Sequence, residues 1–186
     1  MTGNKEAIAT FLNYYLSLGS IVLGLFAILW IILLINSYKT KKDNALLSVI
    51  SIYALPLGFF VSIAGVLLTL IYSDYLGILP CGLCWFQRIF LYSQVFLYGL
   101  AWHKNDRKIF VYTLLLSVVG FVIAVYHSYL QMGYSELLPC PVVASTIDCA
   151  KPTFLEFGFV TFPLMSVVLF ASLILLSITV RRNKIL

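Results

Sequence analysis

Long apolar segments alternate with short polar ones along the whole chain. A helix that crosses a bilayer needs about 20 consecutive, mostly apolar residues. By this measure the pattern predicts five transmembrane helices, at about residues 16–35, 45–72, 81–102, 109–130 and 157–180. Pro56 and Gly58 fall inside the second segment, where they predict a kink.

The composition supports the same class of protein. Of the 186 residues, 62% are hydrophobic and only 10% are charged, whereas soluble domains average about 25% charged residues. The longest polar segment, about 131–156, is too short to bury a core of its own. The sequence therefore predicts an all-α integral membrane protein without a soluble domain.

The basic residues gather in alternate polar segments. Residues 38–44, residues 103–108 and the C-terminal tail hold three Lys or Arg each, nine of the twelve in the chain. The remaining polar segments hold only Lys5 and Lys151. Because basic loops stay in the cytoplasm, we expect the N-terminus outside and the C-terminus in the cytoplasm. The net charge of +5 thus indicates membrane topology and not nucleic-acid binding.

All four cysteines lie in or beside the two polar segments that are expected outside. Cys81 and Cys84 form a Cys-x-x-Cys pair where the third helix begins, and Cys140 and Cys149 lie in the segment 131–156. Disulfides form and persist outside the cytoplasm. Two pairs on the same side can exchange oxidising equivalents through mixed disulfides.

Arg88 follows Cys84 by four residues, so it lies on the same helix face, one turn deeper. An arginine inside the edge of the hydrocarbon is costly unless it is paired or functional. Together with the helix N-terminus, this cation is expected to favour the thiolate form of Cys84. The combination indicates a redox-active dithiol.

Other interpretations of these residues remain open at this point. The Cys-x-x-Cys pair could be half of a zinc site that Cys140 and Cys149 complete, although such sites usually occur in small soluble modules, so we expect no metal. The pairs could also be structural disulfides of a non-catalytic membrane subunit or assembly factor. Arg88 could simply extend to the lipid headgroups.

A dithiol that is oxidised needs an electron acceptor. The chain has no dinucleotide-binding glycine pattern, no phosphate loop and no c-type haem motif. A quinone is the natural acceptor at the edge of a bilayer. His127 could reach its headgroup or could be an ordinary interfacial residue. Trp85 and Phe86 could enclose its ring or belong to an interfacial aromatic belt.

Three features together resemble one family of membrane proteins. They are Cys-x-x-Cys-Trp-Phe-Gln-Arg at 81–88, the later cysteine pair, and Phe-Gly-Phe-Val-Thr-Phe-Pro at 157–163, expected to open the last helix. They resemble the DsbB family of disulfide bond formation proteins, most closely its shorter BdbC-type branch, over about residues 45–180. In the related vitamin K epoxide reductase family the loop cysteines precede the Cys-x-x-Cys, so the order here favours DsbB.

The resemblance implies a four-helix transmembrane bundle at 45–186, preceded by an additional transmembrane helix and basic loop at 1–44. It implies a membrane thiol:quinone oxidoreductase of a prokaryote, which supports disulfide bond formation. Such an enzyme reoxidises a soluble DsbA-like thiol oxidase with a thioredoxin fold, outside the cytoplasm, and reduces ubiquinone or menaquinone.

The resemblance also implies a role for each site residue. By motif position, Cys84 contacts the quinone, Cys81 is its disulfide mate, and Arg88 assists quinone binding. Cys140 forms the mixed disulfide with the soluble partner and Cys149 resolves it. The chain departs from the family pattern in its additional helix, in the close spacing of the loop cysteines, and in a glutamine at position 87 where an acidic residue can occur.

Overall fold

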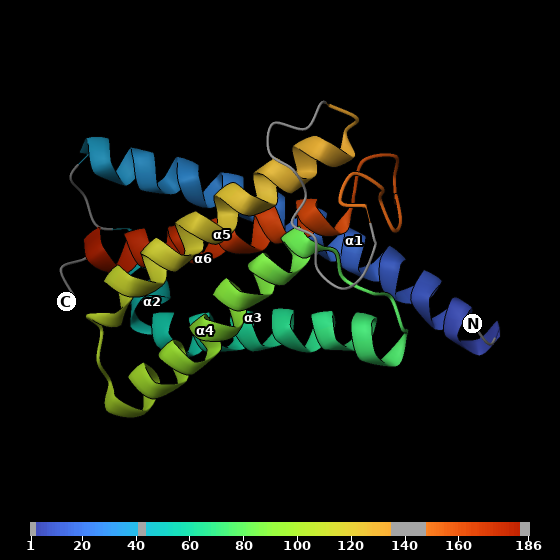
Figure 1. Cartoon of the computed structure of the whole chain (residues 1–186). Helices are drawn as coiled ribbons and strands as arrows, with labels where there is room; N and C mark the ends of the chain where they lie inside the picture. The colour runs from blue at the N-terminus through green and yellow to red at the C-terminus, as the bar shows by residue number, and fades with distance from the viewer. Residues whose placement is uncertain (1–2, 41–43, 135–147, 183–186) are drawn as a thin grey trace.

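The computed structural model describes residues 3–40, 44–134 and 148–182 (Figure 1). Its helices are α1 (Gly3–Thr40), α2 (Ala45–Ile52), α3 (Ala54–Leu70), the π-helix η1 (Ile71–Tyr75), α4 (Gly82–Lys104), α5 (Ile109–Gln131) and α6 (Phe162–Arg182).

Among the described residues, four helical segments are long and apolar enough to cross a membrane: α1, α3 with η1, α5 and α6. Helix α4 has a comparable length of 23 residues, but it carries polar residues at Gln87, Arg88 and Gln94. All three are buried inside the protein and not exposed to lipid. The chain is therefore an all-α, multi-pass membrane protein, as the sequence predicted.

Helices α3, α4, α5 and α6 form the four-helix bundle. Each packs against the next in chain order, and α3 also packs against α6. Helix α1 lies outside this bundle, along α6 (Figure 1). The predicted bundle with one additional N-terminal helix is thus confirmed.

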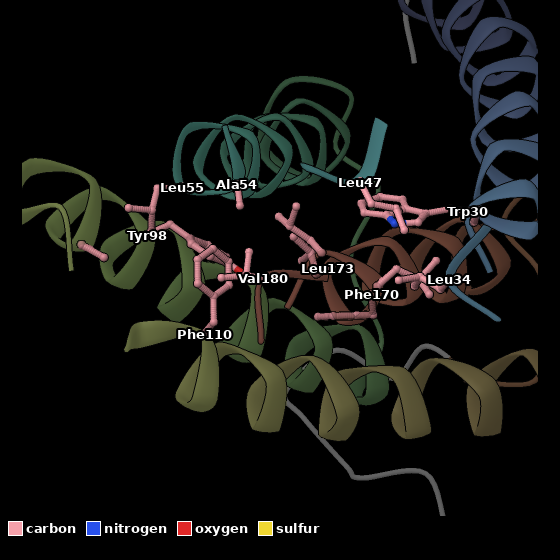
Figure 2. Close-up of a cluster of buried hydrophobic side chains, with 14 of the residues drawn as sticks. Trp30, Leu34, Leu47, Ala54, Leu55, Tyr98, Phe110, Phe170, Leu173 and Val180 are labelled. Atoms are coloured by element: carbon pink, nitrogen blue, oxygen red, sulfur yellow. The ribbon is translucent and has the colours of Figure 1, made fainter. Parts of the chain in front are cut away.

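Glycines let the bundle helices approach one another closely. A Cβ atom at Gly58 of α3 would lie 2.7 Å from the ring of Tyr98, and one at Gly120 of α5 would lie 2.5 Å from the ring of Phe170. Both rings belong to the buried cluster that extends through the bundle to α1 (Figure 2). Such close packing matters in lipid, where helices gain little from the hydrophobic effect when they associate.

The kink expected in the second apolar segment is a break between α2 and α3 at Tyr53. Pro56 has no N–H to donate to the carbonyl of Ile52. Arg107, from the connection between α4 and α5, donates to this carbonyl (3.2 Å) and to the carbonyl of Ser51 (2.8 Å). A residue that the sequence marked only as a topology signal therefore also caps the broken helix.

The last helix begins later than the expected residue 157. Phe157 and Gly158 have left-handed φ values of 53° and 78°, which an α-helix cannot accommodate. They form a tight turn closed by two backbone hydrogen bonds between Glu156 and Val160, of 3.1 and 2.9 Å. The motif at 157–163 is thus mostly a turn that precedes α6, and the expectation that it opens the helix is wrong.

Helix α1 is longer than the expected segment 16–35. Its first turns remain ordered because their polar groups have partners on η1. Asn13 accepts a hydrogen bond from the hydroxyl of Tyr72 (2.7 Å), and Lys5 donates to the carbonyl of Tyr75 (2.8 Å). These contacts hold the start of α1 at the end of the bundle where α4 begins.

The two ends of the molecule differ in charge. The start of α1, the connection from η1 to α4 and residues 148–161 lie at one end (Figure 1). The end of α1, the connection between α4 and α5 and the end of α6 lie at the other, where Arg182 donates to the carbonyl of Ser37 (2.7 Å). The described residues of the three basic segments gather at this second end, away from Cys81 and Cys84.

Candidate redox site

Two free thiols lie where α4 begins. Cys81 is the N-cap residue of α4 and Cys84 lies in its first turn. Because residues three apart lie on one helix face, their Sγ atoms approach to 3.0 Å. Cys81 is buried and Cys84 is half-buried. The pair needs only a small movement to form a disulfide, with the loss of two electrons and two protons.

His127 connects this dithiol to the segment that precedes α6. The imidazole is 1% exposed, and its Nδ1 lies 3.1 Å from Nε2 of Gln87. Because an amide nitrogen can only donate, we assign the imidazole proton to Nε2. This atom lies 3.2 Å from the carbonyl oxygen of Cys149 and 3.6 Å from Sγ of Cys81. The Nε2–H therefore faces the Cys149 carbonyl and the Cys81 sulfur, with the side-chain amide of Gln131 also nearby (3.4 Å).

The surroundings of Cys81 favour its thiolate. The pKa of Cys81 lies below its ordinary value because the Cys84 thiol donates a hydrogen bond to its sulfur, which outweighs the opposing effect of burial, and because His127 lies beside it. The sequence pattern favoured Cys84 as the thiolate. It could not show that a histidine from another helix approaches Cys81.

The second cysteine pair is described only in part. Cys149 is 1% exposed and disulfide-bonded, whereas Cys140 lies outside the described residues, so the bond between these two stays a prediction. Cys149 packs in one buried cluster with Cys81, next to Leu83 and Leu130. The chain segment after the loop therefore lies directly beside the dithiol.

A metal site made of all four cysteines does not agree with this arrangement, because a disulfide-bonded Cys149 supplies no thiolate ligand. Within the described part of the chain, the group that could hold a metal consists of Cys81, Cys84 and His127, whose ligand atoms lie within 4.8 Å of one another.

Arg88 is a buried cation beside the dithiol. It is 8% exposed, its Nη2 donates to the carbonyl of Thr69 (2.7 Å), and its guanidinium lies 5.3 Å from the ring centre of Trp85. Thr69 is two residues before η1, where the backbone changes to π-helical hydrogen bonding, a feature that often occurs at functional sites. The described contacts of Arg88 include no carboxylate, so its charge remains available to a bound molecule.

A cavity of about 410 Å³ opens beside these residues, within the range of about 300–1,000 Å³ that is typical of small-molecule sites. Cys81, Cys84 and Arg88 lie in its wall, while most of the remaining lining is apolar. Trp85 and Phe86 are not lining residues; they are 44% and 43% exposed. They agree with an interfacial aromatic belt and do not enclose a ring in this cavity.

From the sequence alone, the role of Gln87 was not recognised and the role of His127 stayed open. Gln87 appeared only as a departure from a family pattern, yet it is 7% exposed and orients the imidazole. The sequence does place a glutamine and a histidine in neighbouring membrane helices. Buried polar side chains of such helices usually form hydrogen bonds with each other, so this contact could have been predicted.

Comparison with known proteins agrees with this geometry. The family model described as "Disulfide bond formation protein DsbB" matches residues 51–180. The SPbeta prophage-derived disulfide bond formation protein B of Bacillus subtilis (strain 168) is 40% identical over 113 residues, which are 61% of this chain and 75% of that protein. A probable disulfide formation protein of Chlamydia trachomatis serovar D is 35% identical over 132 residues, 71% of this chain and 95% of that protein.

Disulfide bond formation protein C of Bacillus subtilis is 30% identical over 127 residues, which are 67% of this chain and 89% of that protein. No solved structure is a significant match to the chain. Because the matched region contains α3, α4, α5, nearly all of α6 and the Cys-x-x-Cys pair, the chain belongs to the DsbB family of disulfide bond formation proteins.

Proposed function

We propose that this disulfide formation protein is a thiol:quinone oxidoreductase of the plasma or inner membrane of a bacterium. It reoxidises a soluble thiol oxidase with a thioredoxin fold outside the cytoplasm and passes the electrons to a quinone, ubiquinone or menaquinone. The observation that carries the proposal is the free dithiol of Cys81 and Cys84, which opens into an apolar cavity beside the buried cation Arg88.

The residues of the cavity fit a quinone. A quinone accepts two electrons and two protons to become a hydroquinone, and its carbonyl oxygens accept hydrogen bonds. Arg88 supplies donors and a positive charge in a mostly apolar wall, where such a donor is strongly favoured. Cys84 belongs to the same wall and precedes Arg88 by one helical turn, which supports its role as the cysteine that faces the acceptor.

Electrons enter through the second cysteine pair, Cys140 and Cys149. A thiolate of the reduced partner attacks the proposed Cys140–Cys149 disulfide at Cys140, and the second partner thiol then releases the oxidised partner and leaves both loop cysteines reduced. These reduce the Cys81–Cys84 disulfide in turn. His127 would stabilise Cys81 as the leaving thiolate, since its Nε2–H lies 3.6 Å from that sulfur.

The proposed topology has the N-terminus and both cysteine pairs outside and the C-terminus in the cytoplasm. It is supported by the separation of the basic residues from Cys81 and Cys84 at opposite ends of the bundle. In this scheme residues 45–186 carry out the reaction and residues 1–44 are an addition to it. The alternative of a non-catalytic subunit with structural disulfides is less well supported, because Cys81 and Cys84 are free thiols.

The test is quinone reduction by the purified protein when it is supplied with a reduced thioredoxin-fold thiol oxidase, followed by the change in quinone absorbance. We expect turnover with the wild type and with Ser93→Ala, which removes a hydroxyl bonded to the carbonyl of Ile89 in the same helix. We expect no turnover with Cys84→Ser. An unchanged rate for Cys84→Ser would reject the proposal.

A further inference from the structure

The additional helix α1 contributes to the cavity that contains the dithiol. Five residues of α1 line it: Tyr15, Leu16, Gly19, Ser20 and Leu23. The family model begins at residue 51, so all five lie outside the matched region. The other walls come mainly from α3, α4 and α6. The cavity of this protein is therefore incomplete without a helix that the family match does not include.

Contacts along its length hold α1 in this position. Besides the bond between Asn13 and Tyr72 at the cysteine end (2.7 Å), Nε1 of Trp30 donates to the hydroxyl of Thr179 in α6 (3.0 Å). Buried polar contacts of this kind between membrane helices fix their relative position. Helix α1 is thus a fixed wall of the cavity.

The cavity is polar at one end and apolar at the other. Cys81, Cys84 and Arg88 lie at the end where α4 begins, whereas Leu23 and Val61 lie further along α1 and α3, towards the middle of the helices. A molecule with a polar ring and a long hydrocarbon chain matches this gradient. The ring would lie by the dithiol and the chain would run between α1 and α3.

We propose that α1 forms the wall against which the isoprenoid chain of the quinone lies, and that Gly19 sets the width of this passage. The inference rests on the proposed quinone reductase function. It assigns to the additional helix a role in selecting acceptors by their hydrocarbon chain.

Gly19 is the position at which this can be tested with least damage to the fold. A Cβ atom there would meet no atom within 4 Å, so a side chain added at this position begins in open space and does not displace a packed neighbour at its Cβ. Val22, one turn further along α1, is 59% exposed and does not line the cavity. It provides a matched control position on the same helix.

The experiment compares Gly19→Phe, Val22→Phe and the wild type in the full-length protein. Each is assayed with a quinone that carries a long isoprenoid chain and with an analogue that has the same ring and no chain. Because a few misplaced carbon atoms in an apolar site change binding by about tenfold or more, we expect Gly19→Phe to raise the apparent KM for the long-chain quinone by about that factor. Its KM for the chainless analogue and both values for Val22→Phe should equal those of the wild type.

Gly19→Ala is the second variant, with a smaller increase in the same direction, in case the phenylalanine variant does not fold. A wild-type KM for the long-chain quinone in both Gly19 variants overturns the inference while the quinone reductase function stands. An equal increase for both quinones also overturns it, because the effect would then act at the ring. If the wild-type protein reduces no quinone, the proposed function is wrong, and so is the inference that rests on it.

Discussion

Replacing His127 by leucine should shift the reactivity of Cys81 to higher pH. The substitution keeps a buried side chain of similar size but removes the Nε2–H that lies 3.6 Å from Sγ of Cys81. It leaves the Cys84 thiol in place, and this thiol makes the largest contribution to the lowered pKa of Cys81. The variant therefore isolates the contribution of the imidazole.

The expected size follows from the geometry. A hydrogen bond to a charged group contributes about 1.5–3 kcal/mol, and about 1.4 kcal/mol corresponds to one pKa unit. The Nε2–H is shared between the Cys81 sulfur at 3.6 Å and the Cys149 carbonyl at 3.2 Å, so the lower limit applies. We expect the pKa of Cys81 to rise by about one unit.

The assay is the rate of Cys81 alkylation by iodoacetamide as a function of pH, measured peptide by peptide with mass spectrometry. Only the thiolate reacts, so the midpoint of the rate profile reports the pKa. Ser128→Ala is the control, because the Ser128 hydroxyl bonds to the carbonyl of Ala124 and not to the site. A His127→Leu profile with the wild-type midpoint would refute the role given to the imidazole.

Three further predictions address the cation, the packing and the topology. Arg88→Ala should raise the apparent KM for quinone far more than it lowers kcat, and a wild-type KM would remove Arg88 from the acceptor site. Gly120→Ala should lower the melting temperature, because the new Cβ would lie 2.5 Å from the ring of Phe170 and overpacking costs about 1–3 kcal/mol. Gly24→Ala is the control and should leave the melting temperature unchanged, because its Cβ has its nearest contact at 3.8 Å. Asn105→Cys in intact cells should resist a membrane-impermeant maleimide from outside, whereas labelling would reverse the proposed orientation.

Most of the fold could be predicted from the sequence, because apolar length and basic loops are direct consequences of a bilayer. The break near Pro56 was also predictable, since proline removes a helix hydrogen bond. The start of α6 was not, because the left-handed backbone at Phe157 depends on the turn closed by Glu156 and Val160. The full length of α1 depends on partners in η1 that are distant in sequence.

The site was predictable where spacing along one helix decides the geometry. The approach of Cys81 and Cys84 and the place of Arg88 follow from helical periodicity. The contact between Cys81 and His127 joins α4 to α5, and no periodicity shows which residues of two helices meet. For the same reason the position of α1 beside the cavity could not be predicted from the sequence.

In the proposed reaction, electrons leave the Cys81–Cys84 dithiol for a quinone. This step is tested most directly by mixing the reduced, purified protein with quinone under anaerobic conditions, without any soluble partner, and quantifying hydroquinone and the remaining free thiols together. We predict that quinone in excess, which also oxidises the loop cysteines, yields one hydroquinone for every two thiols lost, and that peptide mapping finds a disulfide between Cys81 and Cys84. Hydroquinone formation with Cys81 and Cys84 still free, or no hydroquinone at all, would contradict this electron path.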